Sequence, residues 1–164
     1  MKYKMRFEND IIFFFDKILI NELEKCIEKA TPNEACGLIF GEIQEINNNG
    51  DFNYKYYSKD FQCIDSSNKS PVAFLLDNDD MLIKLSTTIS KNNNLQLIAI
   101  FHSHPAGANP SGFDKKCMKS YHNCGIKKFK HLIWIIMDSR SKEINGFIYL
   151  NNKLLQIAIN FVKD

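Results

Sequence analysis

The order of apolar and polar residues along the chain predicts helices and strands in irregular alternation. Apolar residues recur at helical spacing in 18–30, 77–90 and about 111–122. Pro32 ends the first of these helices, and the turn-forming NNNGD at 47–51 joins two strands into a β-hairpin. The runs that predict strands are 35–46, 52–59, 72–76, 95–104, 131–138 and 144–150, and a last run, 154–162, fits a strand or a helix.

This pattern predicts an α/β fold, more closely an α+β sandwich in which a mixed β-sheet is flanked by helices. The 164 residues contain no linker and no internal repeat, so we expect one domain spanning 1–164. Trp134 and the aromatic run Phe13–Phe15 are predicted to fill the hydrophobic core.

Composition narrows the class of protein. Apolar residues make up 45% and charged residues 24% of the chain, as in ordinary globular proteins, and a net charge of +2 is too small to predict nucleic-acid binding. The apolar run 11–15 is too short for a signal peptide, and no segment approaches the roughly 18 apolar residues of a membrane span. Five cysteines, an odd number without a CxxC pair, favour reduced thiols and a cytoplasmic protein.

The stretch IFHSHPAGANPSGFD at 100–114 holds the main candidates for chemistry. His102 and His104 end a predicted buried strand, and the period of two places both imidazoles on the same face. Asp114 lies one turn inside the next predicted helix, from which its carboxylate can return to the histidines. Two imidazoles and one carboxylate suit zinc and leave a fourth position for water, which is typical of a catalytic site.

A catalytic zinc site also needs a group that accepts a proton from water and later delivers it to the leaving group. Glu34, in TPNEACGLIFG, is the strongest candidate because it directly precedes an apolar strand that can run beside the histidine strand. The sequence alone does not establish that these two strands are neighbours.

Each of these residues also has a purely structural interpretation. Ser111 and Asp114 form the SxxD pattern of a helix capping box, a histidine ending a buried strand is commonly hydrogen-bonded within the fold, and Glu34 alone fits an exposed carboxylate. The order and spacing of all these groups together favour a site. A second metal candidate follows no standard zinc spacing and comprises Cys117, His122, Cys124 and His131.

The segments NEACGLIFG, HSHP and PSGFD, in this order, resemble the JAMM (MPN+) metalloprotease family, whose pattern is a Glu, then HxHP, then SxxD. The resemblance implies the JAMM/MPN (cytidine-deaminase-like) fold and one zinc ion per chain held by His102, His104 and Asp114. It also implies that Glu34 is the general acid/base and that Ser111 hydrogen-bonds the oxyanion. One departure is the PAGANP loop, which has six residues where the family pattern has seven.

The family implies a zinc metalloprotease that hydrolyses the isopeptide or peptide bond after the C-terminal tail of a ubiquitin-like or sulfur-carrier protein, here in a minimal, prokaryote-like version. The alternatives are a non-catalytic scaffold of the MPN type and a DNA-repair-associated relative, which the stretch HSHPAG also resembles. A zinc deaminase is disfavoured because no PCxxC motif follows. The sequence specifies neither the individual protein substrate nor the oligomeric state.

Overall fold

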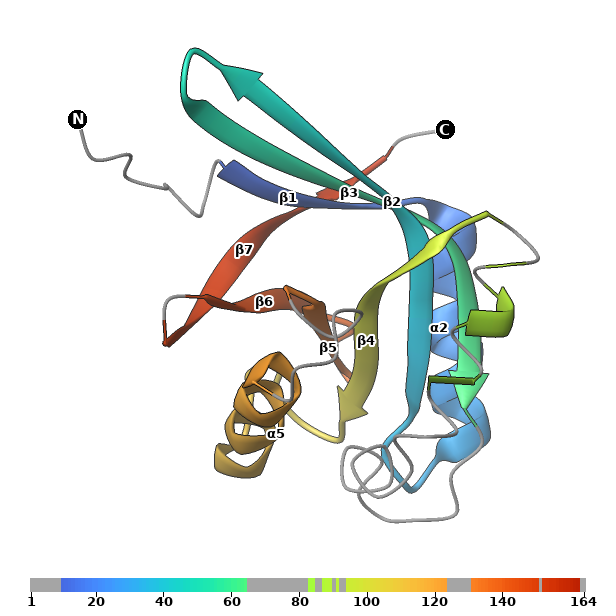
Figure 1. Cartoon of the computed structure of the whole chain (residues 1–164). Coiled ribbons are helices and arrows are strands. Elements are labelled where there is room, and N and C mark those ends of the chain that lie inside the picture. Colours follow the sequence, from blue (N-terminus) through green and yellow to red (C-terminus); the bar gives the residue numbers. More distant parts are fainter. Residues whose placement is uncertain are drawn as a thin grey trace.

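The computed structural model describes residues 10–64, 83–84, 87–89, 91, 94–123, 131–150 and 152–162. Figure 1 shows how its helices and strands are arranged. In chain order these are β1 (Ile11–Phe15), α2 (Lys17–Ala30), β2 (Cys36–Asn48), β3 (Asp51–Ile64), β4 (Gln96–His104), α5 (Gly112–Asn123), β5 (Ile133–Asp138), β6 (Ile144–Leu150) and β7 (Lys153–Phe161).

Most of the predicted elements are confirmed. The helices α2 and α5 match the predictions at 18–30 and 111–122, and β2, β4, β5 and β6 match four predicted strands. Strand β3 is longer than predicted, and the last apolar run forms the strand β7 rather than a helix. The predicted strand at 72–76 and much of the predicted helix at 77–90 lie outside the described residues, although the described positions between 83 and 91 are helical.

Local polar contacts explain where the helix α2 begins and where the hairpin of β2 and β3 turns. The side chain of Asp16 accepts a hydrogen bond from the Leu19 N–H at 2.7 Å, which caps the N-terminus of α2. In the turn between β2 and β3, the side chain of Asn47 accepts a hydrogen bond from the Gly50 N–H at 2.9 Å. Gly50 has a φ of 92°, a conformation that glycine adopts without steric cost.

The strands form a closed barrel in the order β1-β3-β2-β4-β5-β6-β7. The prediction of a mixed sheet is confirmed, because β4 pairs with β5 in parallel while β2 pairs with β3 and β4 in antiparallel fashion. The prediction of a sandwich is corrected in one respect. Strand β1, which was not predicted as a strand, pairs in parallel with both β3 and β7 and thereby joins the two ends of the sheet.

Two hydrophobic clusters cover the two faces of the central strands, and each contains one helix. Residues of α2 pack in one cluster with Phe13, Phe15 and the odd-numbered residues of β5. Residues of α5 pack in the other with Trp134 and the even-numbered residues of β5. Trp134, Phe13 and Phe15 are 2%, 0% and 0% exposed, which confirms their predicted place in the core, whereas Phe14 is half-buried. Among the described residues, no helix is long and apolar enough to cross a membrane.

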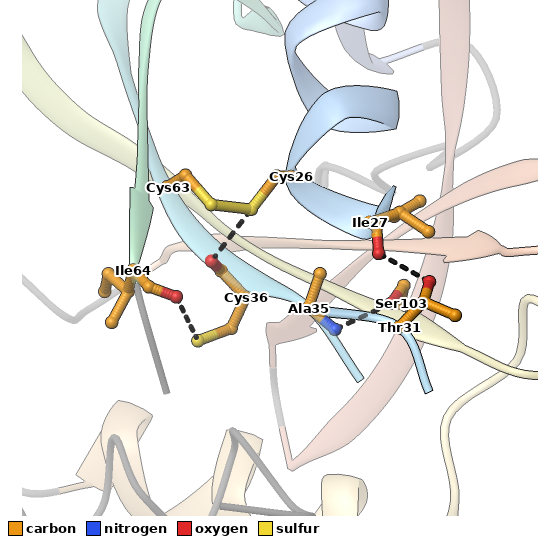
Figure 2. The surroundings of a disulfide bond; sticks show 8 residues. All are labelled: Cys26, Ile27, Thr31, Ala35, Cys36, Cys63, Ile64 and Ser103. Carbon is orange, nitrogen blue, oxygen red and sulfur yellow. Dashed lines mark hydrogen bonds between the residues drawn. A yellow bond between two sulfur atoms is a disulfide. The ribbon is translucent and has the colours of Figure 1, made fainter. Parts of the chain in front are cut away.

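A disulfide bond joins α2 to the end of β3 and corrects the expectation that all thiols are reduced. Cys26 and Cys63 are 37 residues apart in the sequence, and their Cα atoms lie 5.8 Å apart. They meet because α2 packs against β3, a long-range contact that cysteine spacing does not reveal. Figure 2 shows the bond beside the start of β2, with the Cys26 Sγ 3.5 Å from the carbonyl oxygen of Cys36. Cys36 and Cys117 are free and buried.

Candidate metal centre

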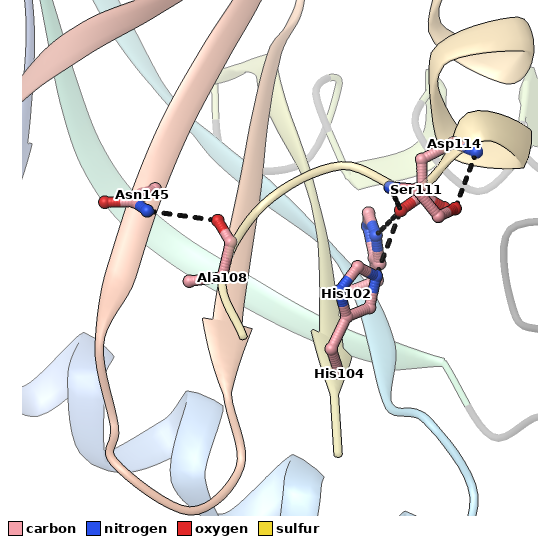
Figure 3. Close-up of polar contacts among 6 residues, drawn as sticks. All are labelled: His102, His104, Ala108, Ser111, Asp114 and Asn145. Atoms are coloured by element: carbon pink, nitrogen blue, oxygen red, sulfur yellow. Dashed lines mark hydrogen bonds and ion pairs between the residues drawn. The ribbon is translucent and has the colours of Figure 1, made fainter. Parts of the chain in front are cut away.

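The histidines at the end of β4 converge on one carboxylate, as Figure 3 shows. The Nε2 atoms of His102 and His104 lie 3.2 Å and 3.0 Å from the Oδ2 atom of Asp114. Both rings are on the α5 side of the sheet, because the alternation along β4 places them on the same face as Ile100, which packs in the cluster that contains α5. The predicted grouping of these three side chains is therefore present.

Asp114 reaches the histidines from the first turn of α5. The Ser111 Oγ accepts a hydrogen bond from the Asp114 N–H at 3.0 Å, and Asp114 Oδ2 accepts one from the Ser111 N–H at 2.9 Å. This reciprocal pair is a helix capping box, so the structural interpretation of the SxxD pattern is also correct. The same cap orients the carboxylate toward both imidazoles, so the two interpretations describe one arrangement.

Burial and the two neighbouring histidines shift the pKa values of this group. Burial by itself raises the pKa of Asp114, but hydrogen bonds from His102 and His104 outweigh it and hold the pKa far below its ordinary value. The hydrogen bond to Asp114 raises the pKa of His104, against the opposing effect of burial. The His102 side chain is fully buried, and that of His104 is 12% exposed. A nearly buried carboxylate that is stabilised by positive charge is a suitable cation ligand.

The donor set also fits the geometry of zinc. Zinc bonds of about 2.0–2.1 Å in a tetrahedron place neighbouring ligand atoms roughly 3.3 Å apart. The two N···O distances, 3.2 Å and 3.0 Å, are close to that edge, and one ligand atom from each of the three side chains lies within 4.8 Å of the others. Among the described residues, this is the one group of three or more His, Cys, Asp or Glu side chains whose ligand atoms lie close enough together to hold a metal ion. The residues present therefore fit one zinc ion with an open fourth position.

Glu34 lies two residues before β2, the strand that neighbours the histidine strand β4. Strand β2 pairs with β4 in antiparallel register as far as Cys36 opposite His102, and the same register continued by two residues would set Glu34 opposite His104. Burial raises the pKa of Glu34, while the positive charges of His104 and His102 oppose that shift. The strand adjacency that the sequence left open is present, and it brings a half-buried carboxylic acid to the metal candidate.

The short loop between β4 and α5 is held by two residues that the sequence analysis did not identify. Asp138, at the end of β5, accepts a hydrogen bond from the Gly107 N–H at 2.8 Å, and the Asn145 side chain donates one to the Ala108 carbonyl at 3.1 Å. Gly107 has a φ of 89°, which favours glycine there. Asp114 thus reaches His102 and His104 although the loop has one residue fewer than the family pattern. In the sequence, Asp138 could have been identified as a polar residue at the end of a buried strand.

In the described part of the chain, Cys117, His122 and His131 of the second metal candidate form no group that could hold a metal ion, although the two histidines are neighbours. The rings of His122 and His131 lie 5.3 Å apart between their centroids, and Cys117 is buried on α5. Burial, followed by the negative charge of Asp114, raises the pKa of the Cys117 thiol to about 11, so this thiol is protonated near neutral pH. Cys124, the remaining member, lies outside the described residues.

Hydrogen bonds at Asp138 predict a change of stability in acid. The N–H groups of Gly107 and Arg140 lower the pKa of Asp138 to about 2, below the roughly 3.9 of an unfolded chain. This stabilisation is therefore complete above pH of about 4 and is lost as the pH falls through 2. We expect Asp138→Asn to lose less stability than the wild type between pH 5 and pH 2.5, measured by urea unfolding. Equal losses in the two proteins would show that Asp138 does not contribute.

Comparisons with known proteins place the chain in a family. The family model described as prokaryotic homologs of the JAB domain matches residues 17–147 of this chain. The chain is 27% identical over 127 residues to a desampylase of Pyrococcus furiosus, covering 77% of this chain and 74% of the relative. The solution structure of protein DSY2949 from Desulfitobacterium hafniense aligns with a TM-score of 0.66 at 20% identity, covering 93% of this chain and 94% of that one, and supports the fold.

The chain therefore belongs to the family of prokaryotic JAB-domain homologs. The resemblance to a minimal, prokaryote-like JAMM/MPN member, inferred from its motifs, is confirmed. The fold is of the JAB/MPN type, with a mixed sheet and few helices.

Proposed function

We propose that this protein is a zinc-dependent isopeptidase that hydrolyses the bond after the C-terminal tail of a ubiquitin-like or sulfur-carrier protein. The observation that carries the proposal is the convergence of His102, His104 and Asp114. Glu34 lies close by, two residues before the neighbouring strand β2, where the charges of the two histidines act on its pKa. Similarity to a desampylase supports the hydrolase class and a ubiquitin-like substrate. A non-catalytic scaffold needs none of these groups together.

In this proposal His102, His104 and Asp114 hold one zinc ion. The ion supplies a Lewis acid that polarises the scissile carbonyl and lowers the pKa of water to near neutrality. The side chains contribute by their fixed positions: β4 orients the two imidazoles, and the capping box orients the carboxylate. Because three protein ligands leave a position open, substrate and water have access to the ion.

Glu34 is proposed to move the proton. Its carboxylate accepts the proton of the attacking water and delivers it to the departing amine, so no covalent acyl-enzyme forms. The raised pKa of Glu34 suits both halves of this exchange, because a carboxylic acid with a higher pKa is a better base when ionised and still an acid when protonated.

Ser111 is proposed to stabilise the oxyanion. The capping box uses the Ser111 Oγ only as an acceptor for the Asp114 N–H. A hydroxyl carries one donor as well as its acceptor positions, so its proton remains to donate to the carbonyl oxygen of the substrate as that oxygen gains charge. The cap and the catalytic role are thus compatible at one side chain.

The proposed function is tested with small proteins that end in Gly-Gly and are joined by an isopeptide bond to a lysine. We expect the purified protein to cleave at least one of them, to lose activity with a zinc chelator, and to regain it when zinc is added. Alkylation with iodoacetamide is expected to leave cleavage largely intact, because the proposed reaction uses no thiol. Burial also raises the pKa of the two free cysteines that the structure describes, Cys36 to about 12 and Cys117 to about 11.

Three outcomes would contradict parts of the proposal. Cleavage of no substrate across a broad panel would remove the isopeptidase function. Full activity in the presence of chelator would refute the proposed dependence on a metal ion. Loss of activity on alkylation with zinc retained would indicate a cysteine nucleophile instead.

Ser111→Ala separates the two roles of Ser111. Loss of the cap lowers the free energy of unfolding by roughly 0.5–2 kcal/mol. Loss of the oxyanion donor lowers kcat by about 10²–10³. The matched control is Asp16→Ala, which removes the cap of α2 and should destabilise the fold comparably while leaving kcat unchanged. If the two variants have equal kcat at a temperature where both are folded, Ser111 has no part in the reaction.

A further inference from the structure

Ser103, between the two histidines, makes an unusual contact with β2. Its N–H donates a hydrogen bond to the Ala35 carbonyl at 3.0 Å, and its Oγ accepts one from the Ala35 N–H at 2.8 Å. Both residues are 1% exposed. Figure 2 shows the contact between the Ala35 nitrogen and the Ser103 side chain at the start of β2.

This contact replaces half of a regular strand pair. In an antiparallel ladder, a hydrogen-bonded pair of opposite residues exchanges two N–H···O=C bonds. Between Ala35 and Ser103 only one such bond is present, and the side-chain hydroxyl takes the place of the Ser103 carbonyl in the other. The regular pairing of β2 with β4 accordingly ends one position earlier, at Cys36 and His102.

The altered contact lies next to Glu34, the residue proposed to transfer the proton. Glu34 directly precedes Ala35, and a regular ladder continued to this point would set it opposite His104, where side chains of a close antiparallel pair lie about 5 Å apart. A fully paired ladder would bring the carboxylate against the imidazole and leave little room for water between them. The Ser103 hydroxyl, inserted at the preceding pair of Ala35 and Ser103, sets the spacing between the two backbone segments at that point.

We propose that Ser103 is a positioning residue for Glu34: its buried hydroxyl, by holding the Ala35 N–H, places the Glu34 carboxylate at a working distance from the group formed by His102, His104 and Asp114. The inference rests on the proposed function of that group. The Ser103 hydroxyl bonds the Ala35 N–H and not the donor atoms of the proposed metal ligands. It lies on the opposite face of β4 from the two histidines, because neighbouring residues of a strand alternate.

The test compares Ser103→Ala with Ser58→Ala. Ser58 is a matched control because it is also a buried serine, 7% exposed, whose hydroxyl bonds a backbone group, the Phe14 carbonyl, on another strand. Three quantities are measured: zinc per chain, kcat and KM on a substrate that the wild type cleaves, and hydrogen exchange of the Ala35 amide by NMR.

Ser103→Ala is expected to keep its zinc and its KM, to lose kcat by about 10-fold to 100-fold, as a misplacement of about 1 Å does, and to exchange the Ala35 amide at least about 10-fold faster. Ser58→Ala keeps kcat and slow exchange at Ala35. Equal kcat in the two loaded variants would overturn the inference, and so would unchanged exchange at Ala35. Loss of zinc in Ser103→Ala would also overturn it, since Ser103 would then act through the ligands.

Two further arrangements keep the test decisive. If Ser103→Ala does not fold, Ser103→Cys replaces the hydroxyl with a weaker acceptor of similar shape, and a kcat equal to that of the wild type would then refute the role. If the wild type cleaves no substrate, the proposed function fails, whereas the exchange rate at Ala35 still shows whether the Ser103 hydroxyl holds this backbone in place.

Discussion

Glu34→Gln is expected to abolish hydrolysis while zinc content and folding stay close to those of the wild type. Glutamine keeps the size and polarity of the side chain but cannot take up the proton of water, so the attacking group is not generated. The loss in kcat should be at least about 10²–10⁴-fold, the usual contribution of general acid-base catalysis. It is measured as cleavage of an isopeptide-linked substrate at equal, verified zinc occupancy.

The matched control for this variant is Glu28→Gln, which changes an exposed glutamate on α2 and should leave cleavage unaffected. Circular dichroism and the urea midpoint establish that both variants fold. Cleavage by Glu34→Gln at the wild-type rate would assign the base to another residue. Loss of zinc from Glu34→Gln would instead make Glu34 a ligand, which the His102, His104 and Asp114 group does not require.

Replacement of one member of the metal group is expected to remove both zinc and activity. The wild type should bind about one zinc ion per chain, and His104→Ala or Asp114→Asn should reduce this to nearly zero, because two remaining ligands do not form a tetrahedral protein site. Zinc is measured by elemental analysis after dialysis against buffer without chelator. In Asp114→Asn the two imidazoles also lose the carboxylate with which they pair in this structure.

His122→Ala is the control for the metal measurement, because His122 belongs to the second, weaker metal candidate and lies outside the group of three. Its zinc content should equal that of the wild type. Zinc loss in His122→Ala with retention in His104→Ala would move the metal to the second candidate. Absence of zinc from the wild type, not recovered when zinc is added, would refute the ligand assignment.

Local sequence determined the parts of the site that depend on neighbours within a few residues. The alternation along β4 places His102 and His104 on one face, and the SxxD spacing predicts the capping box that directs Asp114. These features were predictable because strand alternation follows from the extended backbone of successive residues, and a helix cap depends on hydrogen bonds between residues close in the chain. The apolar patterns of β4, β5 and α5 were readable for the same reason.

The position of Glu34 near the histidine strand depended on tertiary structure. The register that sets Cys36 opposite His102 joins segments far apart in the sequence, and no local pattern specifies which strands become neighbours. The family resemblance supplied this contact before the structure did. The bond between Ser103 and Ala35 belongs to the same register, so it became visible only once the two strands were placed side by side.

The sequence by itself determined the helices α2 and α5, most of the described strands, the core aromatics and the order of the candidate ligands, because burial and backbone hydrogen bonding leave periodic patterns. Only the tertiary structure decided that β1 closes the sheet into a barrel and that Cys26 meets Cys63. Strand β1 is five residues long. An apolar run of this length does not distinguish a strand from other buried segments. Its parallel partners, β3 and β7, are contributed by distant parts of the chain, and such long-range contacts are fixed by packing of the whole fold.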